Sequence, residues 1–148
     1  EVLTMGGFDE IHIGLNDLHL SYGMTFMFEL LANGTVEALC DKFRKAGIPY
    51  GFGGIARIGE GMLPAEKIIM EHYRLGSTRA ILSRSFCNAE EIRDIREIES
   101  IFSENMTRLR NYENSLGQKT NDEYRQNTES VKECVAQIVE KIKEKKAQ

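Results

Sequence analysis

The chain has 148 residues, of which 41% are hydrophobic and 28% are charged, and its formal net charge at pH 7 is −4. This length and composition are typical of one globular domain with a hydrophobic core. The negative charge argues against a nucleic-acid-binding protein, and no apolar run approaches the ~18 residues of a membrane-spanning helix. We therefore expect neither a nucleic acid nor a membrane as a partner.

The three cysteines, Cys40, Cys87 and Cys134, are far apart and form no Cys-x-x-Cys pair. An odd number of separated cysteines argues against a disulfide framework and against a structural zinc site. Cys40 and Cys134 fall at apolar positions of helical segments, so we interpret them as small core residues. This usage fits the reducing cytoplasm, where we expect the protein to reside.

Two parts of the chain differ in composition. Residues 1–87 alternate short apolar segments with helical ones, whereas residues 88–148 are rich in Glu, Lys and Arg. We expect the first part to be an α/β domain and the second to be a helical C-terminal extension. Because the first residue is Glu and not Met, we also expect the chain to be the downstream part of a longer protein.

Strands and helices are predicted to alternate within residues 1–87. The predicted strands are Glu10–Leu15, Tyr50–Gly54 and Arg79–Ser83. The predicted helices are Met24–Ala32, Thr35–Ala46 and Leu63–Leu75, each followed by a Gly or Asn-Gly signal. Strands separated by helices pair in parallel through right-handed crossovers. The pattern therefore predicts a parallel sheet whose strands end at one edge.

Two long helices are predicted after residue 87. Asn88-Ala-Glu-Glu resembles a capping box that opens the first, whose apolar stripe extends to Leu109. Residues 111–118 break this pattern. Thr120-Asn-Asp-Glu is a second capping box that opens the last helix. The apolar stripes of these helices either cover the α/β part of the same chain or contact another subunit.

Asp17, just past the first predicted strand, is the first candidate functional residue. A carboxylate at the C-terminal end of a parallel strand lies where α/β enzymes do their chemistry, and it can bind Mg²⁺ or Mn²⁺. The alternative is a turn or capping acid, since Asn16-Asp17 is also favourable turn chemistry. His19 follows the same motif and is the histidine best placed for proton transfer. His12 and His72 have patterns more typical of structural histidines.

A Gly-rich segment, residues 51–61, begins within the second predicted strand and continues past it. Its backbone N–H groups can hold an anion, and Arg57 adds a forked cation suited to a carboxylate or a phosphate. The segment is neither a P-loop nor a dinucleotide-binding fingerprint. A flexible crossover loop is the alternative. Arg84 follows the third strand and would share the edge with Asp17, either to bind an anion or to form a surface ion pair.

The segment Gly14-Leu-Asn-Asp-Leu, preceded by Gly7-Phe-Asp, resembles the family of 4-hydroxy-2-oxoheptanedioate aldolase and the citrate lyase β-subunit. This family belongs to the pyruvate/phosphoenolpyruvate superfamily of TIM barrels. Its members carry Gly-Val-Asp before a strand and Gly-Pro-x-Asp-Leu after it, and Leu15 stands here in place of the usual Pro. The resemblance continues through Ala46-Gly-Ile-Pro-Tyr-Gly and covers roughly residues 5–87, but the tail after it has no match.

The resemblance implies the C-terminal part of a (β/α)₈ TIM barrel, about three βα units, followed by the long helices. It implies a divalent metal, Mg²⁺ or Mn²⁺, bound by Asp17 and by a Glu of the preceding strand that is not matched in this chain. Combined with the residue patterns, it leads us to assign the metal to Asp17 and catalytic roles to His19 and Arg84. The substrate contacts are assigned to Gly14, Leu15, Asn16, Gly53, Gly54 and Arg57.

The implied chemistry is cleavage or formation of a C–C bond next to a 2-oxo acid, or cleavage of a citryl-like thioester, with the metal holding the enolate of pyruvate. The substrate is then a small 2-oxo acid or acyl compound. Since a complete barrel needs about 250 residues, we expect the isolated chain to be inactive and to form a homo-oligomer through its exposed strand edges. The alternatives are a non-catalytic anion-binding module and an oligomerisation module built on the long helices.

Overall fold

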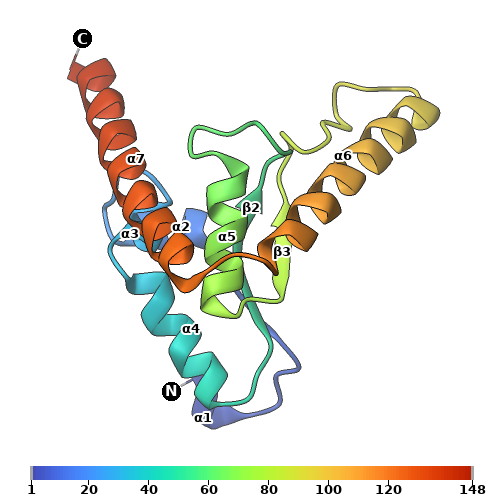
Figure 1. Cartoon of the computed structure of the whole chain (residues 1–148). Helices are drawn as coiled ribbons and strands as arrows, with labels where there is room; N and C mark the ends of the chain where they lie inside the picture. Colours follow the sequence, from blue (N-terminus) through green and yellow to red (C-terminus); the bar gives the residue numbers. More distant parts are fainter. Residues whose placement is uncertain (1, 148) are drawn as a thin grey trace.

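A computed structural model describes residues 2–147 of the chain (Figure 1). Its centre is a parallel sheet in the order β1-β2-β3, formed by β1 (Ile11–Ile13), β2 (Tyr50–Ile55) and β3 (Arg79–Leu82). The predicted parallel α/β arrangement is therefore confirmed at the level of a small three-stranded sheet with helices. Ile13 pairs with Phe52 across the first two strands.

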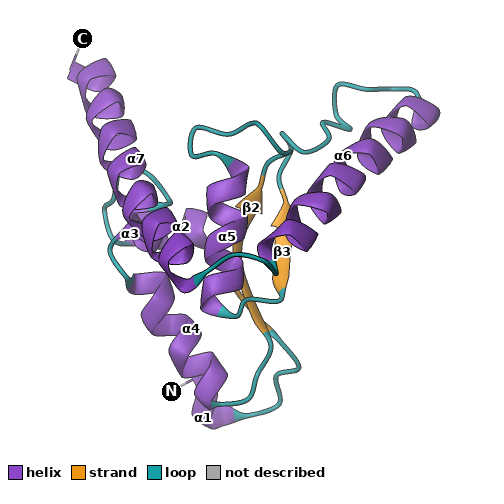
Figure 2. Ribbon diagram, in the orientation of Figure 1, coloured by secondary structure: helices purple, strands orange, loops and turns teal. Residues whose placement is uncertain are grey.

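Helices form most of the remaining structure (Figure 2). They are α1 (Val2–Met5), α2 (Leu15–Ser21), α3 (Glu29–Ala32), α4 (Thr35–Lys45), α5 (Ala65–Leu75), α6 (Ile95–Leu116) and α7 (Asn121–Ala147). Between residues 2 and 147, no helix is long and apolar enough to cross a membrane.

The helices pack against one face of the sheet. Helices α4 and α5 contact β2 and each other, and α7 contacts both α3 and α5. Ile13 and Phe52 point into this interface, where they belong to one buried cluster with Val131 of α7. Cys40 is buried in the same cluster and Cys134 packs partly buried against it, which confirms that they are core residues. The apolar stripe of α7 thus covers the α/β part of its own chain.

The opposite face of the sheet is exposed. His12, Arg79 and Ile81 lie there, and the side chain of Ile81 is 58% exposed. Arg79 Nε donates to Glu10 Oε2 at 2.8 Å, so this pair spans the sheet from the third strand to the residue before the first. Gly51 lies between them on the central strand, where any side chain would collide with the backbone of Arg79. Parallel sheets are normally covered on both faces, and this one is covered on a single face within residues 2–147.

The segment after the first strand differs from the prediction. Residues 15–21 form α2, whereas the sequence predicted the end of a strand followed by a turn. β1 therefore stops at Ile13, two residues before the predicted end. The helix predicted over Met24–Ala32 is regular only over α3. Glu29 explains the late start of α3, since its Oε2 accepts from the backbone N–H groups of Thr25 and Phe26, both at 2.7 Å. The side chain thereby caps a turn at the position where the sequence pattern suggested a helix.

The first long helix also differs from the prediction. The capping box predicted at Asn88 does not begin α6. The helix begins after Asp94, whose Oδ1 accepts from the backbone N–H of Arg96 at 2.9 Å. The predicted break at residues 111–118 is wrong, since α6 continues to Leu116. Leu116 is buried in a second cluster beneath α6, and this burial holds the end of the helix against the body.

The capping box predicted at the start of the last helix is confirmed. Thr120 N–H donates to Glu123 Oε2 at 2.8 Å, and Glu123 N–H donates to Thr120 Oγ1 at 3.2 Å. This reciprocal pair satisfies two backbone donors at the helix start. The Lys119 ammonium donates to the same carboxylate and, together with the hydrogen bonds from Thr120, lowers the pKa of Glu123 to about 2.

Candidate functional site

The three strands end at one edge of the sheet because they are parallel. Each strand is followed along the chain by one candidate residue: Asp17 after β1, Arg57 after β2 and Arg84 after β3. The edge formed by the carboxyl ends of parallel strands is the place where such sheets bind ligands. The topology therefore places Asp17, Arg57 and Arg84 in the segments that follow the strands at this edge, which we call the carboxyl edge.

Asp17 lies in the first turn of α2 and is exposed. Gly14 is the residue before this helix, and a Cβ built on it would lie 3.8 Å from Asp17 Oδ2. The carboxylate therefore folds back over the start of the helix, where the helix dipole favours a negative charge. This position serves as a helix-start acid and also leaves the carboxylate accessible from solvent. Asn16 beside it is exposed as well.

His19 and Leu15 point inward from the same helix. Leu15 is buried in the core, so only its backbone is available to a ligand. His19 is also buried, and its Nδ1 lies 3.2 Å from the carbonyl oxygen of Leu15. Since a carbonyl can only accept, Nδ1 carries the proton in this contact. The ring is thereby held within α2, and little of it is accessible from the carboxyl edge.

Gly53 and Gly54 lie within β2 and not in the loop that follows it. Gly53 has a φ of +59°, and a Cβ there would lie 3.0 Å from Leu15 Cδ1. At Gly54 a Cβ would lie 3.4 Å from the Cβ of Ser83. The missing side chains therefore allow α2 and the end of β3 to pack closely against the central strand.

Arg57 begins the loop between β2 and α5. Its guanidinium lies 2.7 Å from Glu60 Oε1, and both side chains are 43% exposed. Exposed pairs of this kind contribute little to stability, so an anionic ligand could take the place of Glu60. The loop is tied down further along, where Gly59 N–H donates to Glu66 Oε1 at 2.9 Å.

Arg84 extends into solvent from the loop after β3. It lies 3.6 Å from Glu90 in an ion pair whose two side chains are mostly exposed. The neighbouring hydroxyls of Ser83 and Ser85 hydrogen-bond to each other at 2.7 Å. Arg84 therefore forms the surface ion pair that the sequence left open as one of its two roles, and it keeps a large exposed surface for an anion.

Asp17 is the carboxylate at this edge to which the metal is assigned, since Glu60 and Glu90 pair with Arg57 and Arg84. The part of the chain that the structure describes contains no group of three or more His, Cys, Asp or Glu side chains arranged to hold a metal ion. Asp17 by itself does not fit a protein-bound Mg²⁺ or Mn²⁺ site, because such a site needs several oxygen ligands. The described residues thus do not form a group of three or more side-chain ligands around the expected metal.

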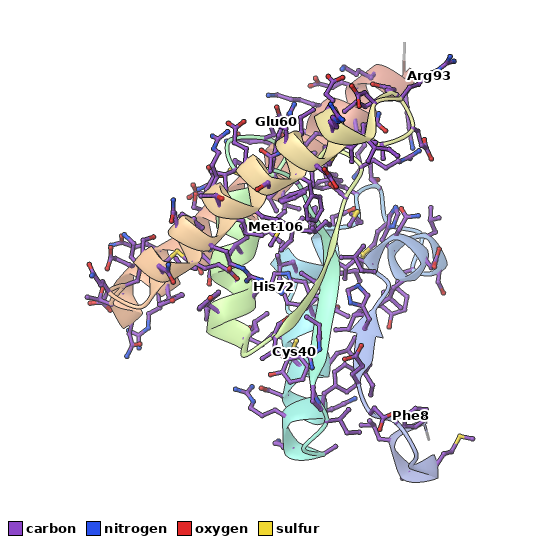
Figure 3. The ribbon with its side chains drawn as sticks, turned by 90° about the vertical axis from the view of Figure 1, so that its right-hand side faces the viewer. Phe8, Cys40, Glu60, His72, Arg93 and Met106 are labelled. Carbon is purple, nitrogen blue, oxygen red and sulfur yellow. The ribbon has the colours of Figure 1, made fainter. Side chains whose placement is uncertain are left out.

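His72 has an environment that the sequence pattern did not reveal. It lies on α5 beside the sheet (Figure 3), its ring is 4% exposed, and it stacks on Phe52 with the ring centroids 3.7 Å apart. Its Nδ1 lies 2.7 Å from Ser77 Oγ. The helical pattern predicted a structural histidine, but the stacking depends on the packing of α5 against β2, which no local signal encodes.

No family model, no curated protein and no solved structure matches this chain.

Proposed function

We propose that the chain forms part of a divalent-metal-dependent lyase that makes or breaks a C–C bond next to a 2-oxo acid. The observation that carries this proposal is the carboxyl edge, to which three parallel strands bring Asp17, Arg57 and Arg84. A carboxylate is a natural ligand for Mg²⁺ or Mn²⁺, and guanidinium groups suit the carboxylate of a 2-oxo acid. In this proposal Asp17 is one metal ligand, and the two arginines bind the anionic substrate.

The architecture that belongs to this proposal is part of a (β/α)₈ barrel. In such a barrel, consecutive strands are neighbours and the helices lie outside. The order β1-β2-β3 with helices on one face supports this architecture over a doubly wound sheet, which has helices on both faces. The exposed side chains of His12 and Ile81 would then face the interior of the barrel.

The proposal requires metal ligands in addition to Asp17. Substrate oxygens and water can supply some of them, and a further carboxylate would come from a protein segment outside the described residues. For this reason we expect the isolated chain to bind the metal weakly and to have little or no activity.

Manganese binding measured by electron paramagnetic resonance tests the proposal, with oxalate as a mimic of the pyruvate enolate. We expect oxalate to strengthen Mn²⁺ binding to the chain and Asp17→Asn to abolish this effect. Asp122→Asn, at the exposed start of α7, is the matched control and should bind like the original chain. Absence of oxalate-dependent binding in the original chain, or its persistence in Asp17→Asn, would contradict the proposal.

A non-catalytic anion-binding module is the second candidate, and the exposed pairing of Arg57 favours it. The same experiment separates the two, because this candidate needs no metal. Oxalate binding in the absence of Mn²⁺ that survives Asp17→Asn but weakens in Arg57→Gln would favour the anion-binding module. Binding that requires both Mn²⁺ and Asp17 would favour the lyase.

A further inference from the structure

A cleft of about 650 Å³ lies between α5, β3 and α6, on the helix-covered side of the sheet. In Figure 1 the C-terminal end of α6 lies near β3, and the helix diverges from the body towards its N-terminal end. The walls are mainly apolar, with Ile55, Ile69, Leu82, Met106 and Leu109 among the lining residues. Ala80, a small residue on β3, also faces the cleft. This volume is within the range of small-molecule sites.

His72 lines this cleft and carries an unpartnered acceptor. Ser77 Oγ lies 2.7 Å from His72 Nδ1 and 3.2 Å from the carbonyl oxygen of Arg79, which can only accept, and we assign the hydroxyl proton to this carbonyl. With this assignment, Nδ1 of His72 carries the ring proton and donates to Ser77 Oγ, and Nε2 presents a lone pair. Nε2 is buried and has no hydrogen-bond partner among residues 2–147. A buried acceptor without a donor is costly, so a donor at this position would stabilise the site.

The charges around the cleft favour a neutral ligand. Burial lowers the pKa of His72 to about 3, so the ring is uncharged at neutral pH. Arg110 and Glu113 both line the cleft and pair with each other at 2.6 Å, while Arg79, whose side chain lies on the other face of the sheet, pairs with Glu10 at 2.8 Å. The charged side chains that line the cleft thus already have partners of opposite sign, and none of them requires an ion.

We propose that this cleft binds a small, neutral, mainly apolar molecule of the indole or substituted-phenol class, whose N–H or O–H group donates to Nε2 of His72. The apolar body of the ligand packs against Leu82, Met106 and Leu109. Because Nε2 is out of contact with solvent, the ligand displaces a neighbouring side chain to reach it. Met106 is suited to this movement, since its unbranched thioether repacks easily. None of Asp17, Arg57 and Arg84 lines this cleft.

Indole and 1-methylindole form a matched pair of probes, because they share an apolar body and only indole has an N–H. The chain contains no Trp, so the fluorescence of either probe can be followed directly. With the full chain, we expect indole to bind about tenfold more tightly than 1-methylindole, the preference that one buried hydrogen bond supports. We also expect the ¹⁵N resonance of His72 Nε2 to shift when indole is added and not when 1-methylindole is added.

Two variants complete the experiment. His72→Phe keeps a ring stacked on Phe52 and should remove the preference for indole, while Ala80→Leu fills the cleft and should abolish binding of both probes. Equal affinity for the two probes, no binding of indole, or a preference that survives in His72→Phe would overturn the proposal. If His72→Phe fails to fold, the Nε2 resonance of the original chain still tests the proposal. An unchanged resonance at saturating indole would also overturn the proposal.

Discussion

His72 is a buried histidine that links the stability of this protein to pH. Its pKa is lowered from 6.5 to about 3, with burial as the main cause. The unfolded chain therefore binds a proton at this residue between about pH 6.5 and pH 3, and the folded chain does not. Since the unfolded state binds more protons in that window, the stabilising contribution is complete above pH 6.5 and is lost as the pH falls.

We therefore expect acidification to lower the free energy of unfolding by roughly 1.4 kcal/mol for each pH unit within this window through His72 alone. Urea denaturation followed by circular dichroism at several pH values measures it. His72→Phe has no titrating ring, so its stability should depend less on pH than that of the original chain. Parallel pH profiles for the two proteins would show that His72 does not carry this linkage.

The candidate site could be predicted only in part at the level of single residues. Asp17, Arg57 and Arg84 were expected at one edge, because parallel pairing follows from alternating strands and helices and requires no knowledge of side-chain packing. His19 and Leu15 were expected to be accessible, and instead they point inward. Their direction is set by α2, and a helix that starts directly after a three-residue strand gives little periodic signal in the sequence.

Element boundaries depended on side chains that act as caps. Thr120 and Glu123 form the reciprocal pair that the sequence pattern specifies, so the start of α7 could be predicted. Asn88 fits the same pattern equally well, but Asp94 caps α6. The local sequence is compatible with a start of α6 at either residue, and tertiary packing determines that the helix begins after Asp94. Leu116 illustrates the same limit at the other end of α6, where burial extends the helix through polar residues that suggested a break.

The contact between α5 and α7 depends on a buried carboxylate. Glu71 is 1% exposed, and its Oε1 accepts from Thr128 Oγ1 at 2.8 Å and from Asn127 Nδ2 at 3.1 Å. Its Oε2 pairs with Arg74 at 2.8 Å, and Arg74 also reaches Glu37 of α4. One carboxylate thus connects two helices directly and a third through Arg74.

We expect Glu71→Gln to lower the free energy of unfolding by about 2–3 kcal/mol, because the amide can keep one hydrogen bond to α7 but loses the charge that pairs with Arg74. Chemical denaturation measures the loss. Glu129→Gln removes an exposed pair with Lys132 on α7 and is the control, with an expected change within about 0.5 kcal/mol. A loss at Glu71 no larger than that of the control would contradict a stabilising role for the buried pair.

In the described part of the chain, the three-stranded sheet has one uncovered face. Its outer strands, β1 and β3, each have an unpaired edge. Unpaired edges and exposed apolar side chains such as Ile81 favour association with another chain. We expect the purified protein to self-associate and Ile81→Lys to shift it towards the monomer, as measured by light scattering or sedimentation.

Met62→Lys provides the control for this experiment, because Met62 is comparably exposed but lies in the loop before α5. It should leave the association unchanged. A monomeric original chain, or equal effects of the two substitutions, would indicate that the open face of the sheet does not mediate association. The three-stranded topology itself could be predicted from the sequence, but the one-sided covering required the positions of α4, α5 and α7.

Helix α7 contributes Val131, Val135, Ile138 and Val139 to the same core as β1 and β2, although more than half of the chain separates them in sequence. During synthesis, the ribosome releases the α/β segment well before these four residues emerge. Until then, the surface that α7 covers remains open to chaperones, to proteases and to other nascent chains. Completion of the core therefore waits for α7 to emerge, and a translational stall between α6 and α7 would leave the α/β segment with an unprotected apolar face.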